Sequence, residues 1–119
     1  MQKENPALDK SFLFAKKIVF LYKNIISKQK EYILSKQILR SGTSIGANIS
    51  EANGAISEAD FSNKISIAYK ECLETKYWLR LLKETDYLEE SVFNELYENA
   101  DELGKILFSI LKKTRINKK

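Results

Sequence analysis

Three lysines and a phenylalanine in the N-terminal part of the chain have the residue types and the spacing to contact nucleic acid. Phe20 has Lys16, Lys17 and Lys23 three or four residues away, and residues at these separations are neighbours on a helix surface. The lysines could hold phosphates while the aromatic ring contacts a base. Alternatively, Phe20 packs in a subunit interface with the lysine stems folded over it. The spacing leaves both interpretations open.

A second basic group lies near the C-terminus and consists of Lys112, Lys113, Arg115, Lys118 and Lys119. These side chains could also hold phosphates, or they could form a solvated helix end whose positive charge is favourable to the helix dipole. Our candidate nucleic-acid-binding residues are therefore Lys16, Lys17, Phe20, Lys23, Lys112, Lys113 and Arg115.

A row of polar residues at spacings of four, four and three crosses the middle of the chain: Arg40, Ser44, Asn48 and Glu51. If the chain reverses near residue 55, Arg40 lies opposite Glu71, with Glu74 one turn further on. These six residues could form a polar site for a ligand or RNA. We favour the simpler interpretation, a network of ion pairs and hydrogen bonds that fixes the register of two helices.

The residue types argue against most enzyme chemistry. The sequence has no histidine and one cysteine. Without histidine there is no His general base, no Ser-His-Asp or Cys-His triad and no His-ligated zinc. A single cysteine excludes disulfides within the chain and Cys-rich metal sites, and Cys72 occupies a heptad position typical of a buried, inert thiol. We therefore predict a protein that is not an enzyme and uses no cofactor or metal.

The segments that carry these residues repeat apolar side chains with helical period. Four glycines and one proline in 119 residues also favour long helices. We predict helices at about residues 6–27, 32–53, 57–83 and 91–114. The first helix has two neighbouring apolar stripes: Leu8, Phe12, Ala15, Val19, Tyr22 and Ile26, and beside them Phe14, Ile18, Leu21 and Ile25.

The second helix contains a stretch of poor helix formers, Ser41 to Gly46, which alone could be a loop. Gly42 and Gly46 are four residues apart and share a face, where the absence of side chains would let a neighbouring helix approach closely. We favour one long helix, and the sequence leaves open whether it is kinked.

Short polar connectors make successive helices antiparallel neighbours. We predict an all-α fold, with residues 1–119 forming a single up-down-up-down four-helix bundle. The most apolar stretch, residues 12–26, is interrupted by lysines and is shorter than the roughly 20 apolar residues of a membrane span. Residues 1–10 lack the apolar core of a targeting signal. We expect a cytoplasmic protein that does not contact membranes.

The net charge of +4 is unevenly distributed. Residues 1–50 hold nine Lys/Arg and three Asp/Glu, residues 51–104 hold five and thirteen, and residues 105–119 hold six and none. In the predicted bundle the first and fourth helices are neighbours. We therefore expect a basic side formed by these two helices and an acidic side formed by the third helix and the connector at 84–90.

Two motifs resemble a known family. Residues 40–52 read R-S-G-T-S-I-G-A-N-I-S-E-A, and residues 70–82 read K-E-C-L-E-T-K-Y-W-L-R-L-L. Both resemble signatures of the small bacterial proteins encoded within intervening sequences of 23S rRNA genes, although Gly46 stands where many members have proline. The resemblance implies a left-handed bundle that assembles into a ring, commonly a homopentamer. It carries over no catalytic residues and transfers Arg40, Ser44, Asn48, Glu51, Glu71 and Glu74 only as fold-defining positions.

The resemblance also extends to accessory proteins of diversity-generating retroelements, which bind nucleic acid and a reverse transcriptase. The extra apolar stripe on the first helix independently suggests self-association. Our leading hypothesis is a non-enzymatic, ribosome-associated oligomer that binds structured RNA, plausibly 23S rRNA, through the basic surface of the first and fourth helices. The alternative is a protein-interaction scaffold or an accessory subunit of a nucleic-acid enzyme such as a reverse transcriptase.

Overall fold

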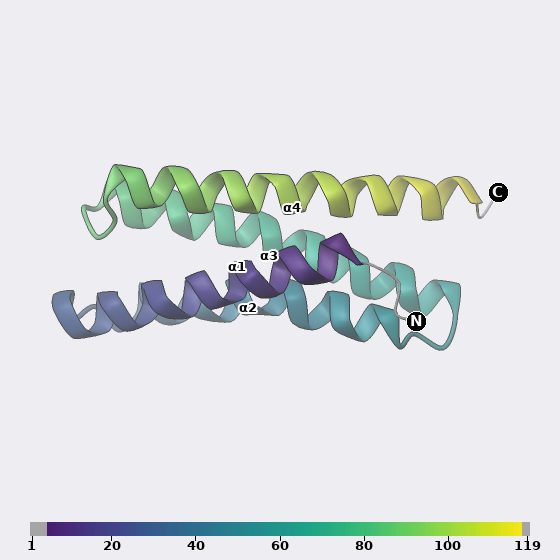
Figure 1. The fold of residues 1–119 in the computed structure, drawn as a ribbon, viewed down its shortest axis with the longest axis horizontal. Helices are drawn as coiled ribbons and strands as arrows, with labels where there is room; N and C mark the ends of the chain where they lie inside the picture. Colours follow the sequence, from purple (N-terminus) through teal and green to yellow (C-terminus); the bar gives the residue numbers. More distant parts are fainter. Residues whose placement is uncertain (1–4, 118–119) are drawn as a thin grey trace.

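Helices account for most of residues 5–117, the part of the chain that the computed structural model describes, with side chains described as far as residue 114. The elements are α1 (Pro6–Asn24), the short π-helix η1 (Ile25–Gln29), α2 (Leu34–Asn53), α3 (Glu58–Glu84) and α4 (Glu90–Asn117). The long helices alternate in direction and pack along their lengths (Figure 1). Within the described residues there is no strand, and the prediction of an all-α four-helix bundle is confirmed.

Side-chain caps explain where two of the helices begin. The Asn5 side chain accepts a hydrogen bond from the Leu8 amide at 3.0 Å, and Pro6 occupies the first helical position. At the start of α3, Ser57 Oγ accepts from the Asp60 amide at 3.0 Å. The Asp60 carboxylate in turn accepts from the amide of Ile56, the residue before the cap, at 3.2 Å, which is a variant of the capping box.

The first amides of α2 are held by the side chain of Glu31. Its carboxylate accepts hydrogen bonds from the amides of Ile33, Leu34 and Ser35 at 3.1, 3.0 and 2.9 Å. Burial opposes ionisation of this carboxyl, but the backbone hydrogen bonds outweigh burial, so the pKa of Glu31 is lowered. The helix consequently starts at Leu34, two residues later than the predicted residue 32.

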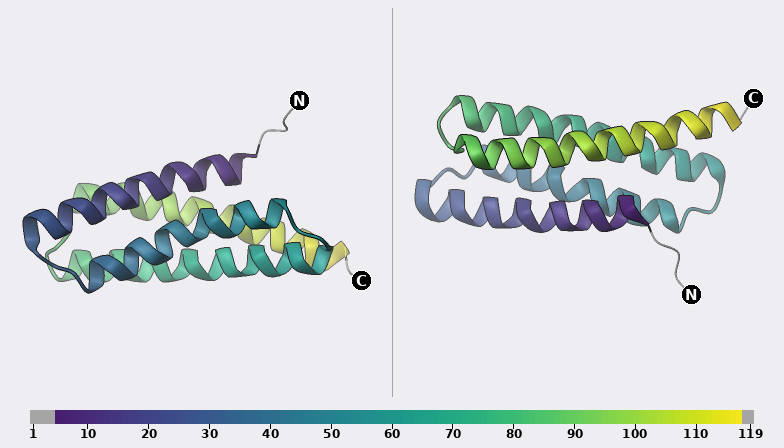
Figure 2. Two further views of the ribbon diagram at one scale, coloured as in Figure 1. Left: turned by 90° about the horizontal axis from the view of Figure 1, so that it is seen from below. Right: turned by 45° about the horizontal axis from the view of Figure 1, so that its top comes forward.

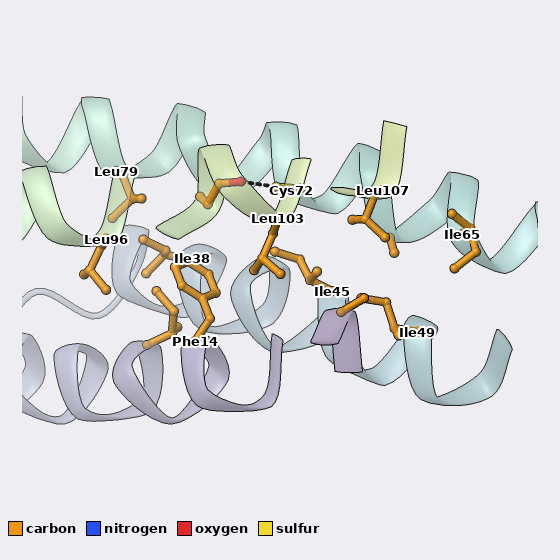
Figure 3. Close-up of a cluster of buried hydrophobic side chains, with 14 of the residues drawn as sticks. Phe14, Ile38, Ile45, Ile49, Ile65, Cys72, Leu79, Leu96, Leu103 and Leu107 are labelled. Atoms are coloured by element: carbon orange, nitrogen blue, oxygen red, sulfur yellow. Dashed lines mark hydrogen bonds between the residues drawn. The ribbon is translucent and has the colours of Figure 1, made fainter. Parts of the chain in front are cut away.

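The core contains one face of each long helix (Figure 3). On α3 the buried residues are spaced three and four apart, as in a heptad repeat that includes Cys72: Ile65, Ala68, Cys72, Thr75, Leu79 and Leu82. On α1 the buried stripe is the one that contains Phe14 and Ile18, whereas Phe12 of the neighbouring stripe is 65% exposed. The longer of the two predicted apolar stripes is therefore only partly buried, and Phe12 is its exposed member.

Small residues bring α1 and α2 close together. The helix α2 runs without interruption through Gly42 and Gly46. A Cβ at Gly42 would lie only 2.9 Å from Cγ1 and Cγ2 of Ile18, and a Cβ at Gly46 would lie 3.1 Å from Ser11 Oγ. The two glycines thus provide the space in which α1 packs, as the sequence suggested.

The pair α1 and α4 closes the bundle, and these two helices contact each other less extensively than the other neighbouring pairs (Figure 2). None of the helices within residues 5–117 combines the length and the apolar composition that a membrane span requires.

Candidate nucleic-acid interface

The outer face of α1 presents an aromatic ring between two lysines. Phe20 is 64% exposed, and Lys16 and Lys23 are exposed on either side of it. Among the residues whose side chains are described, neither lysine forms an ion pair. This part of α1 therefore keeps positive charge that no carboxylate among the described side chains neutralises.

The lysines of α1 that point toward α4, unlike Lys16 and Lys23, form ion pairs. Lys17 Nζ lies 2.8 Å from Glu95 Oε2 and donates a hydrogen bond to Asn99 Oδ1 at 3.0 Å. About two turns earlier on the same face of α1, Lys10 Nζ lies 2.6 Å from Glu102 Oε2. The junction of α1 and α4 is thus a line of ion pairs, and it lacks the continuous positive charge that we expected from these two helices.

The second basic group lies elsewhere. The Lys10–Glu102 and Lys17–Glu95 pairs define the register of the two antiparallel helices. Because α4 rises about 1.5 Å per residue, Lys112 lies about 15 Å beyond the level of Lys10, further still from Lys16 and Lys23. Lys112 and Lys113 are exposed at that end, and the side chain of Arg115 lies outside the described residues. The structure therefore does not bring the candidate residues together in one site.

A groove of about 540 Å³ opens between α1 and α4 near η1. Phe20 and Asn24 line it from α1, and Val92 lines it from α4. The sequence indicated the α1 side, because Asn24 is four residues from Phe20. It held no signal for Val92, since only the tertiary register places that residue opposite Phe20.

The six residues of the predicted polar network form separate contacts. Arg40 Nη1 lies 3.0 Å from Glu71 Oε2, and Arg40 Nη2 pairs with Glu74, whose carboxylate also accepts from Trp78 Nε1 at 3.1 Å. The hydrogen bond from Trp78, followed by that from Arg40, lowers the pKa of Glu74. These contacts tie α2 to α3 at a guanidinium that is 49% exposed.

The other three residues do not join this pair. Ser44 donates to the Arg40 carbonyl at 2.6 Å, and the Asn48 side chain donates to the Ser44 carbonyl at 2.9 Å, so both bond within α2. Glu51 instead pairs with Lys64 of α3 at 2.8 Å. The row is therefore a set of two interhelical ion-pair contacts with local hydrogen bonds between them.

The single cysteine lies in the core. Cys72 Sγ donates to the Ala100 carbonyl at 2.9 Å, the contact drawn in Figure 3. Burial raises the pKa of this thiol to about 11, so the thiol is protonated at neutral pH and is a poor nucleophile. Within the part of the chain that the structure describes, no three acidic, cysteine or histidine side chains gather as a metal site would require.

Residues 3–109, most of the chain, match the family model of the 23S rRNA-intervening sequence protein. The chain belongs to this family. Among solved structures, it is similar to a protein of unknown function from the S23 ribosomal protein family of Bacteroides thetaiotaomicron VPI-5482. The two are 53% identical, the match covers 89% of this chain and 98% of that chain, and the TM-score is 0.88. No curated protein matches the chain.

The family membership confirms the resemblance that the motifs at residues 40–52 and 70–82 indicated. The contacts in the structure show what the residues of those motifs do. The first motif contains the two glycines that face α1 and also Arg40. The second motif contains Glu71 and Glu74, the two carboxylates with which Arg40 pairs. In this chain both motifs therefore serve the packing of α2 against its neighbouring helices.

Proposed function

We propose that this member of the 23S rRNA-intervening sequence protein family is a non-enzymatic, cytoplasmic RNA-binding protein that acts as an oligomer. The observation that carries the proposal is the outer face of α1, where Lys16 and Lys23 are exposed without a carboxylate partner among the described residues. Unpaired lysines can release counterions from RNA phosphates, which is the main source of affinity in sequence-independent binding. The family name directs the choice of target to 23S rRNA.

The proposed contact surface is smaller than the sequence suggested. Lys17 forms an ion pair with Glu95, and the pair adds little net charge to this surface. Lys112 and Lys113, at the far end of α4, would belong to a second, separate contact. A long or folded RNA, or a ring of several copies, would be needed to engage both groups, and this supports an oligomer acting on structured RNA.

The test is binding of a 23S rRNA fragment to the wild type and to the double variant Lys16→Glu/Lys23→Glu at several salt concentrations. We expect the logarithm of the wild-type affinity to fall linearly with the logarithm of salt concentration. The double variant should bind at least tenfold more weakly, with a smaller salt slope. The matched control is Lys36→Glu/Lys70→Glu, which makes the same charge change at two exposed lysines of α2 and α3.

Equal losses of affinity in the two double variants would mean that only overall charge matters and that the α1 face is the wrong site. Unchanged affinity in both double variants would mean that these lysines do not contribute to RNA binding.

A second candidate function, a protein-interaction scaffold or accessory subunit of a nucleic-acid enzyme, is favoured by the ion pairs between α1 and α4. These pairs reduce the basic surface available to RNA. A scaffold should retain a protein partner in a pull-down after nuclease treatment, whereas an RNA binder should lose partners that RNA had bridged.

A further inference from the structure

The groove between α1 and α4 has an apolar interior of the size of a small-ligand site. Its volume is about 540 Å³, within the range of about 300–1,000 Å³ that small-molecule sites occupy. The buried side chains of Ile25, Leu88 and Leu96 form its floor. Phe20 and Val92, both exposed, line it from opposite helices. The ring of Phe20 thus offers an aromatic surface beside an apolar slot.

The charges that line the groove cancel. Lys17 and Lys28 line it together with Glu89 and Glu95, and Lys17 and Glu95 pair at 2.8 Å. A phosphate inside the groove would meet two carboxylates, so the interior suits a neutral, flat group. Asn24 and Gln29 add amides at the edge, and Gln29 is held by a hydrogen bond of 2.9 Å from its Nε2 to the Tyr87 carbonyl.

The positive charge lies just outside the groove. Lys16 and Lys23 are four and three residues from Phe20, so they flank its ring on the surface of α1. The step of seven residues from Lys16 to Lys23 spans about 10 Å of helix, which is the length of about three stacked nucleotides at roughly 3.4 Å each. Phosphates on these two lysines would bracket a base at Phe20.

We propose that the groove takes one unpaired base of a single-stranded RNA segment, stacked on Phe20, with the neighbouring phosphates on Lys16 and Lys23. The inference rests on the proposed RNA-binding function and names the class of RNA. A duplex keeps its bases stacked on one another and offers proteins its backbone and shallow minor groove, so a base can reach this slot only from an unpaired segment. The amide groups of Asn24 and Gln29 can then hydrogen-bond to the edge of the base.

The test compares an unstructured 12-nucleotide single-stranded RNA with a 12-base-pair RNA duplex, using fluorescence anisotropy. A 2-aminopurine in the single strand reports stacking through its fluorescence. The variant Phe20→Leu keeps the apolar bulk and removes the ring. Its control is Phe108→Leu, the same change at an exposed phenylalanine of α4 that lines neither this groove nor the one between α1 and α2. Val92→Met is a second variant, which adds a long side chain without an aromatic ring to the groove from α4 and leaves the sequence of α1 unchanged.

Base–aromatic stacking accounts for about a fivefold or larger change in affinity when the ring is removed. We therefore expect Phe20→Leu and Val92→Met to weaken single-strand binding, Phe20→Leu at least fivefold, and to reduce the change in 2-aminopurine fluorescence that accompanies binding. Phe108→Leu should change neither the affinity nor the fluorescence, and duplex binding should be the same in all of these variants. Thermal unfolding and light scattering check that each variant keeps its fold and its mass.

The outcomes separate this inference from the proposed function. If the wild type binds RNA and Lys16→Glu/Lys23→Glu binds less, but Phe20→Leu binds the single strand normally, the groove does not take a base and the RNA-binding function stands. If the wild type binds neither RNA, both fail. If Phe20→Leu lowers the mass of the particle, Phe20 packs between subunits and the stacking proposal is overturned.

Discussion

At the scale of single residues, the two glycines of α2 show how much depends on the atom that each one faces. Gly42 faces Ile18, a fully buried branched side chain with no room to move. Gly46 faces the small Ser11, and the Cβ that it lacks would sit 3.1 Å from the hydroxyl oxygen. The same substitution should therefore have different consequences at the two positions.

We expect Gly42→Ala to lower the free energy of unfolding by about 1–3 kcal/mol, the usual effect of overpacking a core. At Gly46 the tight contact with Ser11 opposes a gain in helix propensity of up to about 1 kcal/mol, so Gly46→Ala should be much closer to neutral. Urea unfolding of both variants checks this order. A Gly42→Ala protein as stable as the wild type would mean that α1 and α2 are not in this close contact.

At the scale of elements, the start of α2 depends on one carboxylate. Glu31 holds three amides that would otherwise lack partners, in a place where the sequence has no Ser, Thr, Asp or Asn as the capping residue. The negative charge also lies at the positive end of the helix dipole. Glu31 caps the helix from two residues before the N-cap position, which Ile33 occupies. Amino-acid preferences for the N-cap position therefore did not indicate it.

Because the folded-state pKa of Glu31 is lowered, its ionised form stabilises the native state above the ordinary pKa near 4.5, and this stabilisation is lost as the pH falls through the folded-state value. We expect Glu31→Ala to lower the free energy of unfolding at pH 7 by about 1 kcal/mol. The difference from the wild type should shrink at pH 3.

Urea unfolding at the two pH values measures that difference. A matched control is Glu84→Ala, which removes an exposed carboxylate for which no hydrogen bond or ion pair is found among the described residues. If Glu31→Ala and Glu84→Ala have equal effects at pH 7, the cap contributes nothing beyond charge.

At the scale of the whole molecule, one chain does not bury all of its apolar surface. A groove of about 580 Å³ lies between α1 and α2, bordered by Phe12 and Ala15 on one side and by Gly46 and Ala47 on the other. Its small residues leave a hollow that a second copy could fill. The self-association that we proposed would use this face, and the family resemblance makes a homopentamer the expected form.

We therefore expect light scattering at micromolar concentration to give a mass several times 13.8 kDa, with five copies favoured. Phe12→Asp should reduce the mass, because the carboxylate would be buried in the interface. Tyr32→Asp, a change at an exposed aromatic residue outside this groove, is the control and should leave the mass unchanged. A wild-type monomer would contradict the assembly.

Much of the fold could be predicted from the sequence, because local rules decide it. The single heptad stripe of α3, from Ile65 to Leu82, leaves no choice of core face, and the caps Asn5 and Ser57 mark helix starts within a few residues. The pairing of Arg40 with Glu71 also follows from a short connector, since a tight reversal restricts the register of adjacent helices.

The candidate site depended on the tertiary structure. Both apolar stripes of the first helix have helical spacing in the sequence. The tertiary structure buries the stripe that contains Ile18, which faces Gly42, and leaves Phe12 exposed. Whether a lysine of α1 keeps its charge unpaired depends on α4, which is distant in the sequence. Glu95 neutralises Lys17, while Lys16, one residue away, stays exposed. Sequence periodicity determines which face a residue occupies, but the charge that it meets there is decided by the helix packed alongside.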